Sequence, residues 1–507
     1  ISRYKRLDGQ GYAILKPADI AKGLDFLNGL QYRLNTSYSY APSLNALYQG
    51  RLAGSTQNGN ASVSSEYGIN WLIENILTWQ KDFGANHIDF TGLYSAQKFS
   101  DFSYSAGAVG FINDLLSYNN LGAGATQSAG SNASSYTLLS QMARINYSFK
   151  NTYLLTLTAR RDGYSAFGAN TSKYGLFPSI AAGWNISNES FMQNVRAVNN
   201  LKIRFGYGQT GNQAISPNQT TTTDRTVLYP FNGLTTIGTV PNVLGNANLH
   251  WETSTTGDLG VDFGLINERI SGTIDIYHTD TKGLLLKRQL PVITGYSSVW
   301  ANLGETTNQG IEVTLNTTNI KSHNFTWTSD IVFASNRNRI IDLYGDKKSD
   351  LGNRWFIGEP INVIYDYKKL GIWQNSAKNE AAIYHAKPGD LKFEDVNDDS
   401  VINSSDMMIL GSPDPKWTGG IANTFTYKSF SLRVFIQTVQ GVLRDNSQLS
   451  WLDLAGRRNI PAGLTYWTPD NNNNNMPSLS YTNTFGYGFP QNASYTRLRD
   501  VTLTYTL

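Results

Sequence analysis

Five residues between positions 395 and 406 carry oxygen atoms at the spacing of ligands around one cation. They fall at positions 1, 3, 5, 7 and 12 of a twelve-residue loop, and they are Asp395, Asn397, Asp399, Val401 through its backbone carbonyl, and Asp406. Oxygen atoms in this order are the ligands with which such loops wrap Ca²⁺. The pattern therefore predicts a structural calcium site that staples the loop.

Two of these loop positions depart from the usual pattern. Ser400 stands at position 6, where the sharp turn usually needs Gly, and Asp406 replaces the customary bidentate Glu. Both departures predict a weaker or differently shaped site. The alternative interpretation is a solvated turn, which Asp and Asn form without a metal. The residues leave both interpretations open.

The other residues of catalytic type form no enzyme pattern. The chain has no Cys, which excludes disulfides, thiolate metal sites and Cys nucleophiles. GYGQTGN (206–212) lacks the strand–loop–helix context of a phosphate loop, and the Ser of GYSAFG (163–168) is off the GxSxG pattern. The five histidines are scattered without an HExxH motif, at His87, His250, His278, His323 and His385. We therefore expect that the chain is not an enzyme.

The composition favours strands and polar loops as the elements that position these residues. Only 16% of the 507 residues are charged, whereas 12% are aromatic, and ordinary soluble proteins have roughly 25% charged residues. The net charge of +3 is too small to indicate nucleic-acid binding. No run approaches the roughly 18 apolar residues of a membrane helix. If the chain spans a bilayer, it must do so as a β-barrel.

Segment after segment alternates with a period of two residues, as strands do. In LKIRFGYGQ (201–209), Leu201, Ile203, Phe205 and Tyr207 share one face, and Lys202 and Arg204 lie on the other. GDLGVDFGL (257–265) likewise places its apolar residues on one face and its Asp and Gly residues on the other. A soluble sandwich also alternates, with its apolar face inward, so the period alone does not separate it from a membrane wall.

The connections favour the membrane wall. Lys150-Asn151, Asn267-Glu268-Arg269 and Lys428-Ser429 are tight turns, and the long polar stretches are 210–250, 282–307, 337–417 and 441–494. Short turns at one end and long loops at the other are typical of an outer-membrane barrel. We expect 1–507 to be one β-barrel domain, with 337–417 and 441–494 as long external loops. The Asn471–Asn475 run predicts a flexible insert.

Tryptophans near strand ends predict aromatic girdles at the membrane interfaces, and the alternative is that they are ordinary core or loop aromatics. The candidates are Trp184, Trp251, Trp327 and Trp417. Further tryptophans on the loops are candidate platforms for sugar rings, although the residues do not choose among them: Trp300, Trp355, Trp373 and Trp451. Arg160, Arg161 and Asp162 form a charged rim cluster that could contact lipopolysaccharide phosphate.

Several stretches, taken in order, resemble one family. They include YLLTLTARRDGYSAFG (153–168), LKIRFGYGQTGNQ (201–213), NLGETTNQGIEVTLN (302–316) and the segment 388–432 around the Asp-rich loop. The chain is similar to the SusC-like (RagA-like) TonB-dependent transporters of the Bacteroidetes outer membrane. The resemblance covers residues 140–507 closely and 1–139 more loosely.

The resemblance implies a multi-pass barrel of about 22 strands in the outer membrane, closed by a plug. It also implies import of oligosaccharides or peptides, energised through TonB, with a SusD-like surface lipoprotein. We expect the plug, the TonB-contacting segment and the last strands to be absent from this sequence, which opens on ISRYKRLDGQ. The alternatives are a secreted all-β protein that binds or cleaves glycans, and a passive porin.

Overall fold

A computed structural model describes residues 1–20, 23–53, 58–450 and 463–507. Its main element is a sheet of 16 strands, in the order β1-β3-β4-β5-β6-β7-β8-β9-β12-β13-β16-β17-β22-β23-β26, with β2 also paired to β3. The chain divides into two compact units. One comprises Ile1–Asn194, Lys202–Leu259 and Thr279–Glu305, and the other comprises Val195–Leu201, Gly260–His278 and Thr306–Leu507.

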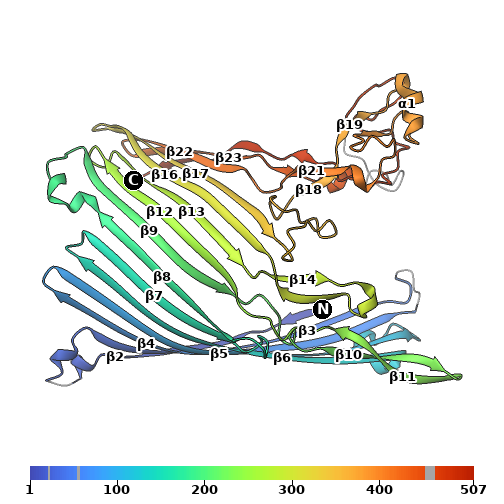
Figure 1. Ribbon diagram of the computed structural model, residues 1–507, viewed down its shortest axis with the longest axis horizontal. Helices are drawn as coiled ribbons and strands as arrows, with labels where there is room; N and C mark the ends of the chain where they lie inside the picture. The colour runs from blue at the N-terminus through green and yellow to red at the C-terminus, as the bar shows by residue number, and fades with distance from the viewer. Residues whose placement is uncertain (21–22, 54–57, 451–462) are drawn as a thin grey trace. The chain divides into compact units, whose positions relative to one another are not determined.

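The first unit contains strands, most of them long, that run side by side (Figure 1). They are β1 (Ser2–Tyr4), β2 (Leu7–Leu15), β3 (Leu30–Gln49), β4 (Asn60–Phe83), β5 (Asn86–Phe111), β6 (Gly124–Phe149), β7 (Tyr153–Tyr164), β8 (Tyr174–Asn185) and most of β9 (Val198–Asn212). Two hairpins stand outside the large sheet: β10 (Thr223–Phe231) with β11 (Leu234–Val243), and β14 (Leu285–Gln289) with β15 (Ser298–Asn302). Strands β12 (Glu252–Leu265) and β13 (Ile270–Lys282) contribute residues to both units.

The second unit combines wall strands with smaller loop elements. The wall strands are β16 (Glu305–Lys321, whose first residue belongs to the first unit), β17 (Phe325–Asp342), β22 (Trp417–Tyr427), β23 (Phe430–Gln440) and β26 (Tyr495–Tyr505). The loop elements are β18 (Ile364–Tyr367), β19 (Lys369–Ile372), α1 (Lys378–Ile383), β20 (Leu391–Phe393), β21 (Met407–Gly411), β24 (Leu443–Arg444), α2 (Ser447–Ser450) and β25 (Gln491–Asn492).

Short 3-10 turns complete the element order. They are η1 (Pro17–Asp19), η2 (Asp25–Leu27), η3 (Ser117–Asn119), η4 (Leu121–Ala123), η5 (Ile186–Asn188), η6 (Ser190–Met192), η7 (Val292–Thr294), η8 (Asn375–Ala377) and η9 (Ser404–Asp406). Among the described residues, no helix is both long and apolar enough to cross a membrane.

One face of the wall strands is apolar and exposed. In β9, Ile203, Phe205 and Tyr207 are 37%, 47% and 51% exposed. They stand opposite Trp184, Ala182 and Ile180 of β8. A sandwich would bury such a face against a second sheet. The exposed apolar stripe therefore fits a wall whose outer side meets hydrocarbon, as the alternation predicts.

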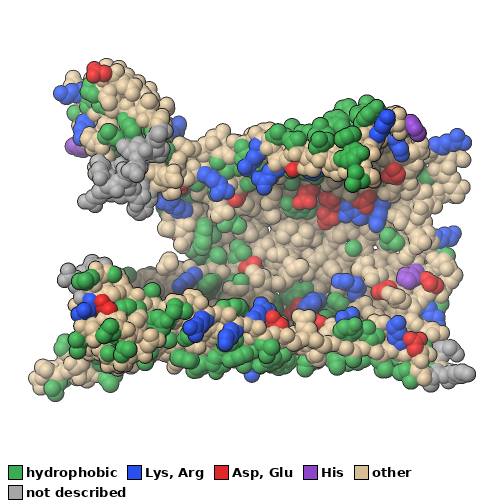
Figure 2. Space-filling model, turned by 180° about the vertical axis from the view of Figure 1, so that it is seen from behind, with side chains coloured by type: hydrophobic (Ala, Val, Ile, Leu, Met, Phe, Trp, Pro, Cys, Tyr) green, Lys and Arg blue, Asp and Glu red, His purple; other side chains and the backbone are tan. Residues whose placement is uncertain are grey.

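The opposite face of the same strands is polar and cross-linked by side-chain hydrogen bonds. Asp89 of β5 accepts hydrogen bonds from Gln80 Nε2 at 2.7 Å and from Asn146 Nδ2 at 3.2 Å. The hydroxyl of Thr156 on β7 donates to Asn146 Oδ1 at 2.8 Å, which extends the row to a fourth strand. Figure 2 shows the division on the first unit, where hydrophobic side chains follow the lower margin and charged side chains lie above them.

The three predicted tight turns are confirmed. Lys150 and Asn151 both have φ of 53°, and Thr152 N–H donates to Phe149 O at 2.9 Å. Two consecutive left-handed residues make a type I′ turn, whose twist matches that of the flanking strands. The turn between β22 and β23 is Lys428-Ser429, with Lys428 at φ 51°. The turn between β12 and β13 begins one residue earlier than predicted, at Ile266.

Three of the four candidate girdle tryptophans lie where their side chains are accessible. Trp184 and Trp417 are each 38% exposed, and Trp417 packs on Phe333 with ring centroids 5.8 Å apart. Trp327 is partly exposed and stacks on Phe425. The prediction for Trp251 is wrong, because its side chain is only 8% exposed and belongs to a buried aromatic cluster.

The division of faces predicts opposite effects for a lysine placed at adjacent positions of β7. Leu157→Lys puts a charge on the exposed apolar face, and we expect it to destabilise the full-length protein in a lipid bilayer by about 2–4 kcal/mol near mid-bilayer. Thr156→Lys, one residue away, puts the same charge on the polar face near the Asp89 row. Urea titration of folding into lipid vesicles measures both variants. Equal losses of stability would contradict the assignment of the two faces.

Candidate functional site

The connections β17–β22 and β23–β26 fold together into a loop module with its own core. We define the loop module as residues 364–411, 443–450 and 463–489. Its core is mostly aromatic, and it contains Tyr367, Ile372, Leu391, Phe393, Leu449, Trp467, Met476, Tyr481, Tyr487 and Phe489. The Phe393 ring packs 5.2 Å from that of Tyr367 and 5.1 Å from that of Tyr487. Residues about 100 positions apart thus share one hydrophobic core.

The asparagine run (Asn471–Asn475) is hydrogen-bonded to other parts of the loop module, whereas the sequence predicts a flexible insert. Asn474 Oδ1 accepts hydrogen bonds from the Ile372 N–H at 3.3 Å and from Gln374 Nε2 at 3.0 Å. Gln374 Oε1 in turn accepts a bond from Trp467 Nε1 at 2.9 Å. The Asn475 carbonyl accepts Lys369 Nζ at 2.6 Å. The run therefore ties the two connections together.

A buried carboxylate helps to hold the loop module. Asp366 is 7% exposed and accepts the Gly488 N–H at 2.7 Å and the Tyr367 N–H at 2.7 Å. Burial raises the pKa of the Asp366 carboxyl, while the two N–H groups act in the opposite direction.

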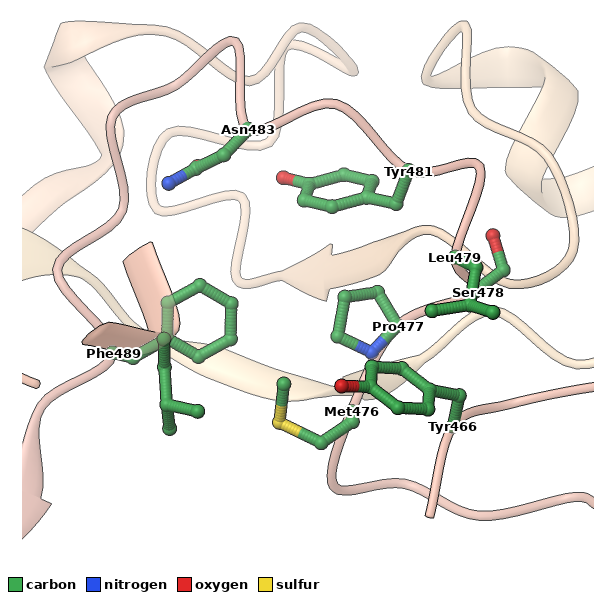
Figure 3. A pocket seen from close by; sticks show the side chains of 9 residues that line it. Tyr466, Met476, Pro477, Ser478, Leu479, Tyr481, Asn483 and Phe489 are labelled. Atoms are coloured by element: carbon green, nitrogen blue, oxygen red, sulfur yellow. The ribbon is translucent and has the colours of Figure 1, made fainter. Parts of the chain in front are cut away.

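A small cavity inside the loop module is too small for a solute. It measures about 20 Å³, which is room for about one water molecule. Figure 3 shows Tyr481 and Asn483 on one side and Met476, Pro477 and Tyr466 on the other. The hydroxyl of Tyr466 is buried with no hydrogen-bond partner among the described residues.

A larger cleft lies where the wall strands of the second unit meet the loop module. We call it the root cleft, and its volume is about 800 Å³, within the usual range for ligand sites of about 300–1,000 Å³. It is lined by residues 336–339, 358–360, 363, 409–412, 414–416, 440–443, 492 and 494. It lies where β17 continues beyond Ala334, the last residue of β17 paired with β22.

Hydrogen bonds fix the walls of the root cleft. Asn338 Oδ1 accepts the Ile361 N–H at 2.8 Å, and Asn338 Nδ2 donates to Asp414 Oδ2 at 3.3 Å. Ser412 Oγ donates to the Asn362 carbonyl at 2.8 Å. The sequence analysis did not single out this site. Its one visible signal is SNRNR (335–339), where the strand becomes polar on both faces.

The Asp-rich loop is held by its own Asx turns. Asp395 Oδ2 accepts the Ser400 N–H at 2.8 Å, and Asp399 Oδ1 accepts the Val401 N–H at 2.8 Å. Asn397 Oδ1 accepts the Asp399 N–H at 3.2 Å. Ser400 adopts φ 62°, the left-handed conformation that usually favours Gly at this position.

Asp406 closes the same loop from its far end. Its side chain is fully buried, and it accepts the Val396 N–H at 2.9 Å and the Asn403 N–H at 2.8 Å. Asn403 caps η9 and completes a capping box with Asp406. Backbone donors thus satisfy all three predicted carboxylates. Within the described ranges no group of three or more His, Cys, Asp or Glu is gathered as for a metal. Calcium binding here stays a prediction.

The candidate sugar platforms differ in access. Trp373 is 3% exposed, covered by the Tyr384 ring and by Lys392 Nζ at 4.1 Å, so it offers no open face. Trp300 packs against a buried cluster in the first unit. Trp355 is partly exposed. Trp451 lies outside the described residues.

Residues of the glycine-rich motifs take part in a second aromatic cluster, which lies in the first unit. The Phe167 ring lies 5.1 Å from Tyr164 and 5.2 Å from Trp251, and Phe177 lies 5.4 Å from Trp251. In GYGQTGN, the Phe177 ring packs against Gly211 so closely that a Cβ atom at this position would overlap the ring. Gly211 is therefore needed for packing.

The rim cluster at the end of β7 is split between the two faces. Arg160 Nε forms an ion pair with Asp162 at 2.8 Å and Arg160 also donates to Ser140 Oγ, on the polar face. Arg161 lies over the Tyr174 ring at 4.0 Å.

Comparison with known proteins identifies the family. The family model "TonB dependent receptor-like, beta-barrel" matches residues 18–507. The chain belongs to the TonB-dependent receptor β-barrel family. It is therefore an outer-membrane protein with a transmembrane antiparallel β-barrel fold, and it is not an enzyme.

Two relatives of this chain are named as TonB-dependent receptors. TonB-dependent receptor P26 of Formosa agariphila is 34% identical over 503 residues, which cover 95% of this chain and 50% of that protein. TonB-dependent receptor SusC of Bacteroides thetaiotaomicron is 32% identical over 392 residues, 73% of this chain and 38% of that protein. The chain thus spans about half the length, or less, of these relatives.

The fold also matches a solved structure. The RagAB peptide transporter aligns with a TM-score of 0.81 at 22% identity, covering 99% of this chain and 55% of that chain. The resemblance to SusC-like and RagA-like receptors drawn from the sequence is therefore confirmed at the level of family and fold.

The packing role of Gly211 can be tested against a second glycine of the same strand. Gly211→Ala would drive a methyl group into the Phe177 ring, and we expect a loss of about 1–3 kcal/mol in unfolding free energy. Gly206→Ala on the same strand is the control, because its nearest neighbour would be Asp258 Cβ at 3.9 Å. Denaturant titration of the full-length receptor compares the two. A Gly211→Ala variant as stable as the control would refute the role.

The calcium prediction can be tested by proteolysis of the Asp-rich loop in the full-length receptor. If the loop binds Ca²⁺, EGTA should speed cleavage by the endoproteinase Glu-C after Glu394, and Asp395→Ala with Asp399→Ala should abolish that response. Asp342→Ala with Asp346→Ala is the matched control, since both carboxylates also accept backbone N–H groups in a loop. Cleavage that is equally fast with Ca²⁺ and with EGTA would rule calcium out.

Proposed function

We propose that this chain is part of an importer that carries oligosaccharides or peptides across the outer membrane, driven through TonB. In this proposal it works with a SusD-like surface lipoprotein that captures the solute over the external loops. The observation that carries the proposal is the division of one set of strands into an exposed apolar face and a hydrogen-bonded polar face, in a member of the TonB-dependent receptor family.

The polar face supports a lumen through which a hydrated solute can pass. The row from Gln80 through Asp89 to Thr156 exposes amides, carboxylates and hydroxyls in place of aliphatic side chains. Such groups exchange hydrogen bonds with a polar solute and with a plug that fills the barrel. The apolar face supports insertion into lipid.

The folded loops support capture of an extended solute. Long wall connections end in a module with a buried core and enclose a cleft of about 800 Å³ at its root. The solved relative is described as a peptide transporter, and the SusC relative is named a TonB-dependent receptor. We keep both solute classes, since both are extended, polar and rich in hydrogen-bonding groups.

Two other functions fit the observations less well. A secreted glycan-binding or glycan-cleaving protein would bury its apolar strand faces, whereas Phe205 and Tyr207 are about half exposed. A passive porin needs no TonB, and the chain belongs to the TonB-dependent family.

Lipopolysaccharide is a further proposed contact. Arg161 is the residue of the rim cluster best placed for it, because its guanidinium lies over the Tyr174 ring, while Arg160 is paired with Asp162. A guanidinium at the rim can bind phosphate with two hydrogen bonds.

Uptake by whole cells tests the proposal. Cells that express the full-length receptor should accumulate labelled oligosaccharides or peptides of its substrate class, and deletion of the receptor or of TonB should abolish accumulation. The protonophore CCCP should have the same effect as deletion of TonB. Uptake that persists without TonB would instead indicate a porin. Recovery of the protein in the soluble fraction without detergent would indicate a secreted protein. Co-purification with a surface lipoprotein tests the proposed partner.

A further inference from the structure

The root cleft carries more positive than negative charge. Its lining includes the cations Arg337, Arg339 and Lys416 and the carboxylates Glu359 and Asp414. In the part of the chain that the structure describes, the side chains of the three cations make no hydrogen bond or ion pair. Figure 2 shows Lys and Arg side chains gathered where the wall strands of the second unit meet the loop module.

One of the two lining carboxylates, Asp414, already has other partners. Asp414 Oδ2 accepts Asn338 Nδ2 at 3.3 Å, and Asp414 Oδ1 accepts Asn362 Nδ2 at 3.5 Å. In the described part of the chain neither Asp414 nor Glu359 forms an ion pair with these cations. Arg337 and Arg339 therefore keep their donors for a ligand, and each guanidinium can bind a carboxylate through two parallel N–H groups.

Amide groups on the same lining supply neutral hydrogen bonds. Asn336 accepts the Tyr277 hydroxyl at 2.9 Å, and Gln440 Nε2 donates to Thr438 Oγ1 at 2.8 Å. Asn492 lines the cleft beside them. Fixed amides suit the hydroxyl groups of a sugar or the backbone of a peptide, while the cations add a requirement for negative charge.

We infer that the root cleft binds a carboxylate-bearing segment of the solute, with Arg337 and Arg339 as the groups that recognise the carboxylate. This inference rests on the proposed import function and specifies the ligand class at one site. Lys416 adds a third positive charge, and Glu359 disfavours phosphate-dense or highly charged polyanions. The same chemistry could come from a uronate oligosaccharide or from an acidic peptide.

Binding to the purified full-length receptor tests the inference. The probes are tetragalacturonate, tetraglutamate and neutral maltotetraose, measured by calorimetry in detergent at low salt. We expect at least one acidic probe to bind at least about tenfold more tightly than maltotetraose, and the Arg337→Gln, Arg339→Gln variant to lose that preference. Tighter binding of tetragalacturonate assigns an oligosaccharide ligand, and tighter binding of tetraglutamate assigns a peptide.

A matched control distinguishes binding at the root cleft from nonspecific attraction of the acidic probe by positive charge. Lys378→Gln with Lys387→Gln also removes two positive charges from the loop module, at exposed positions outside the root cleft. This variant should bind the acidic probe as the unmodified receptor does. Heat-modifiable gel migration confirms that each barrel is folded, and Arg337→Lys with Arg339→Lys should restore part of the affinity because the charge returns without the planar fork.

Two results would overturn the inference. One is equal affinity for acidic and neutral probes, and the other is an equal loss of binding in the arginine and lysine variants. If TonB-dependent uptake of neutral solutes is observed alongside either result, the inference fails and the import function stands. If no solute is taken up in a TonB-dependent way, the proposed function itself fails.

Discussion

Backbone hydrogen bonding inside lipid is the constraint on which the rest of this structure depends. A chain that crosses the hydrocarbon layer without apolar helices must satisfy each N–H and C=O group through neighbouring strands. The large antiparallel sheet does this strand by strand, with type I′ or similarly tight turns such as Lys150-Asn151 between neighbours. Once the backbone is paired in this way, the side chains have only two faces to occupy.

The two faces then acquire different chemistry. Apolar residues such as Phe205 can remain exposed on one face because lipid, and not water, surrounds that side in the outer membrane. The other face must stay hydrated, and the Asp89 row shows how amides, hydroxyls and a carboxylate satisfy one another there. A single period of two thus produces both membrane insertion and a polar interior.

The loops cannot rely on lipid, and they build separate cores in water. The loop module buries aromatic rings from two connections, and the asparagine run joins them through Asn474. In the first unit, Tyr164 and Phe167 of GYSAFG join a second core with Trp251, and Gly211 of GYGQTGN leaves space for the Phe177 ring. A packed loop module of this kind can keep its part of the root-cleft lining, residues 409–411 and 443, in place for a ligand, without the cost of ordering a mobile segment.

The sequence by itself determined the family, the all-β fold, the alternation of faces and the tight turns. These features are local: a period of two or a two-residue turn is visible within ten residues. Tertiary structure decided what depends on partners far along the chain. Trp251 is read as an interface residue from its position near a strand end, yet it is buried by Phe167 and Phe177. The sequence predicts a flexible insert at the asparagine run, but its partners Ile372 and Gln374 lie about 100 residues away along the chain. The root cleft is visible only when the end of β17 meets residues 409–416 and 440–443, because a cavity is a property of the packing between segments and not of any one of them.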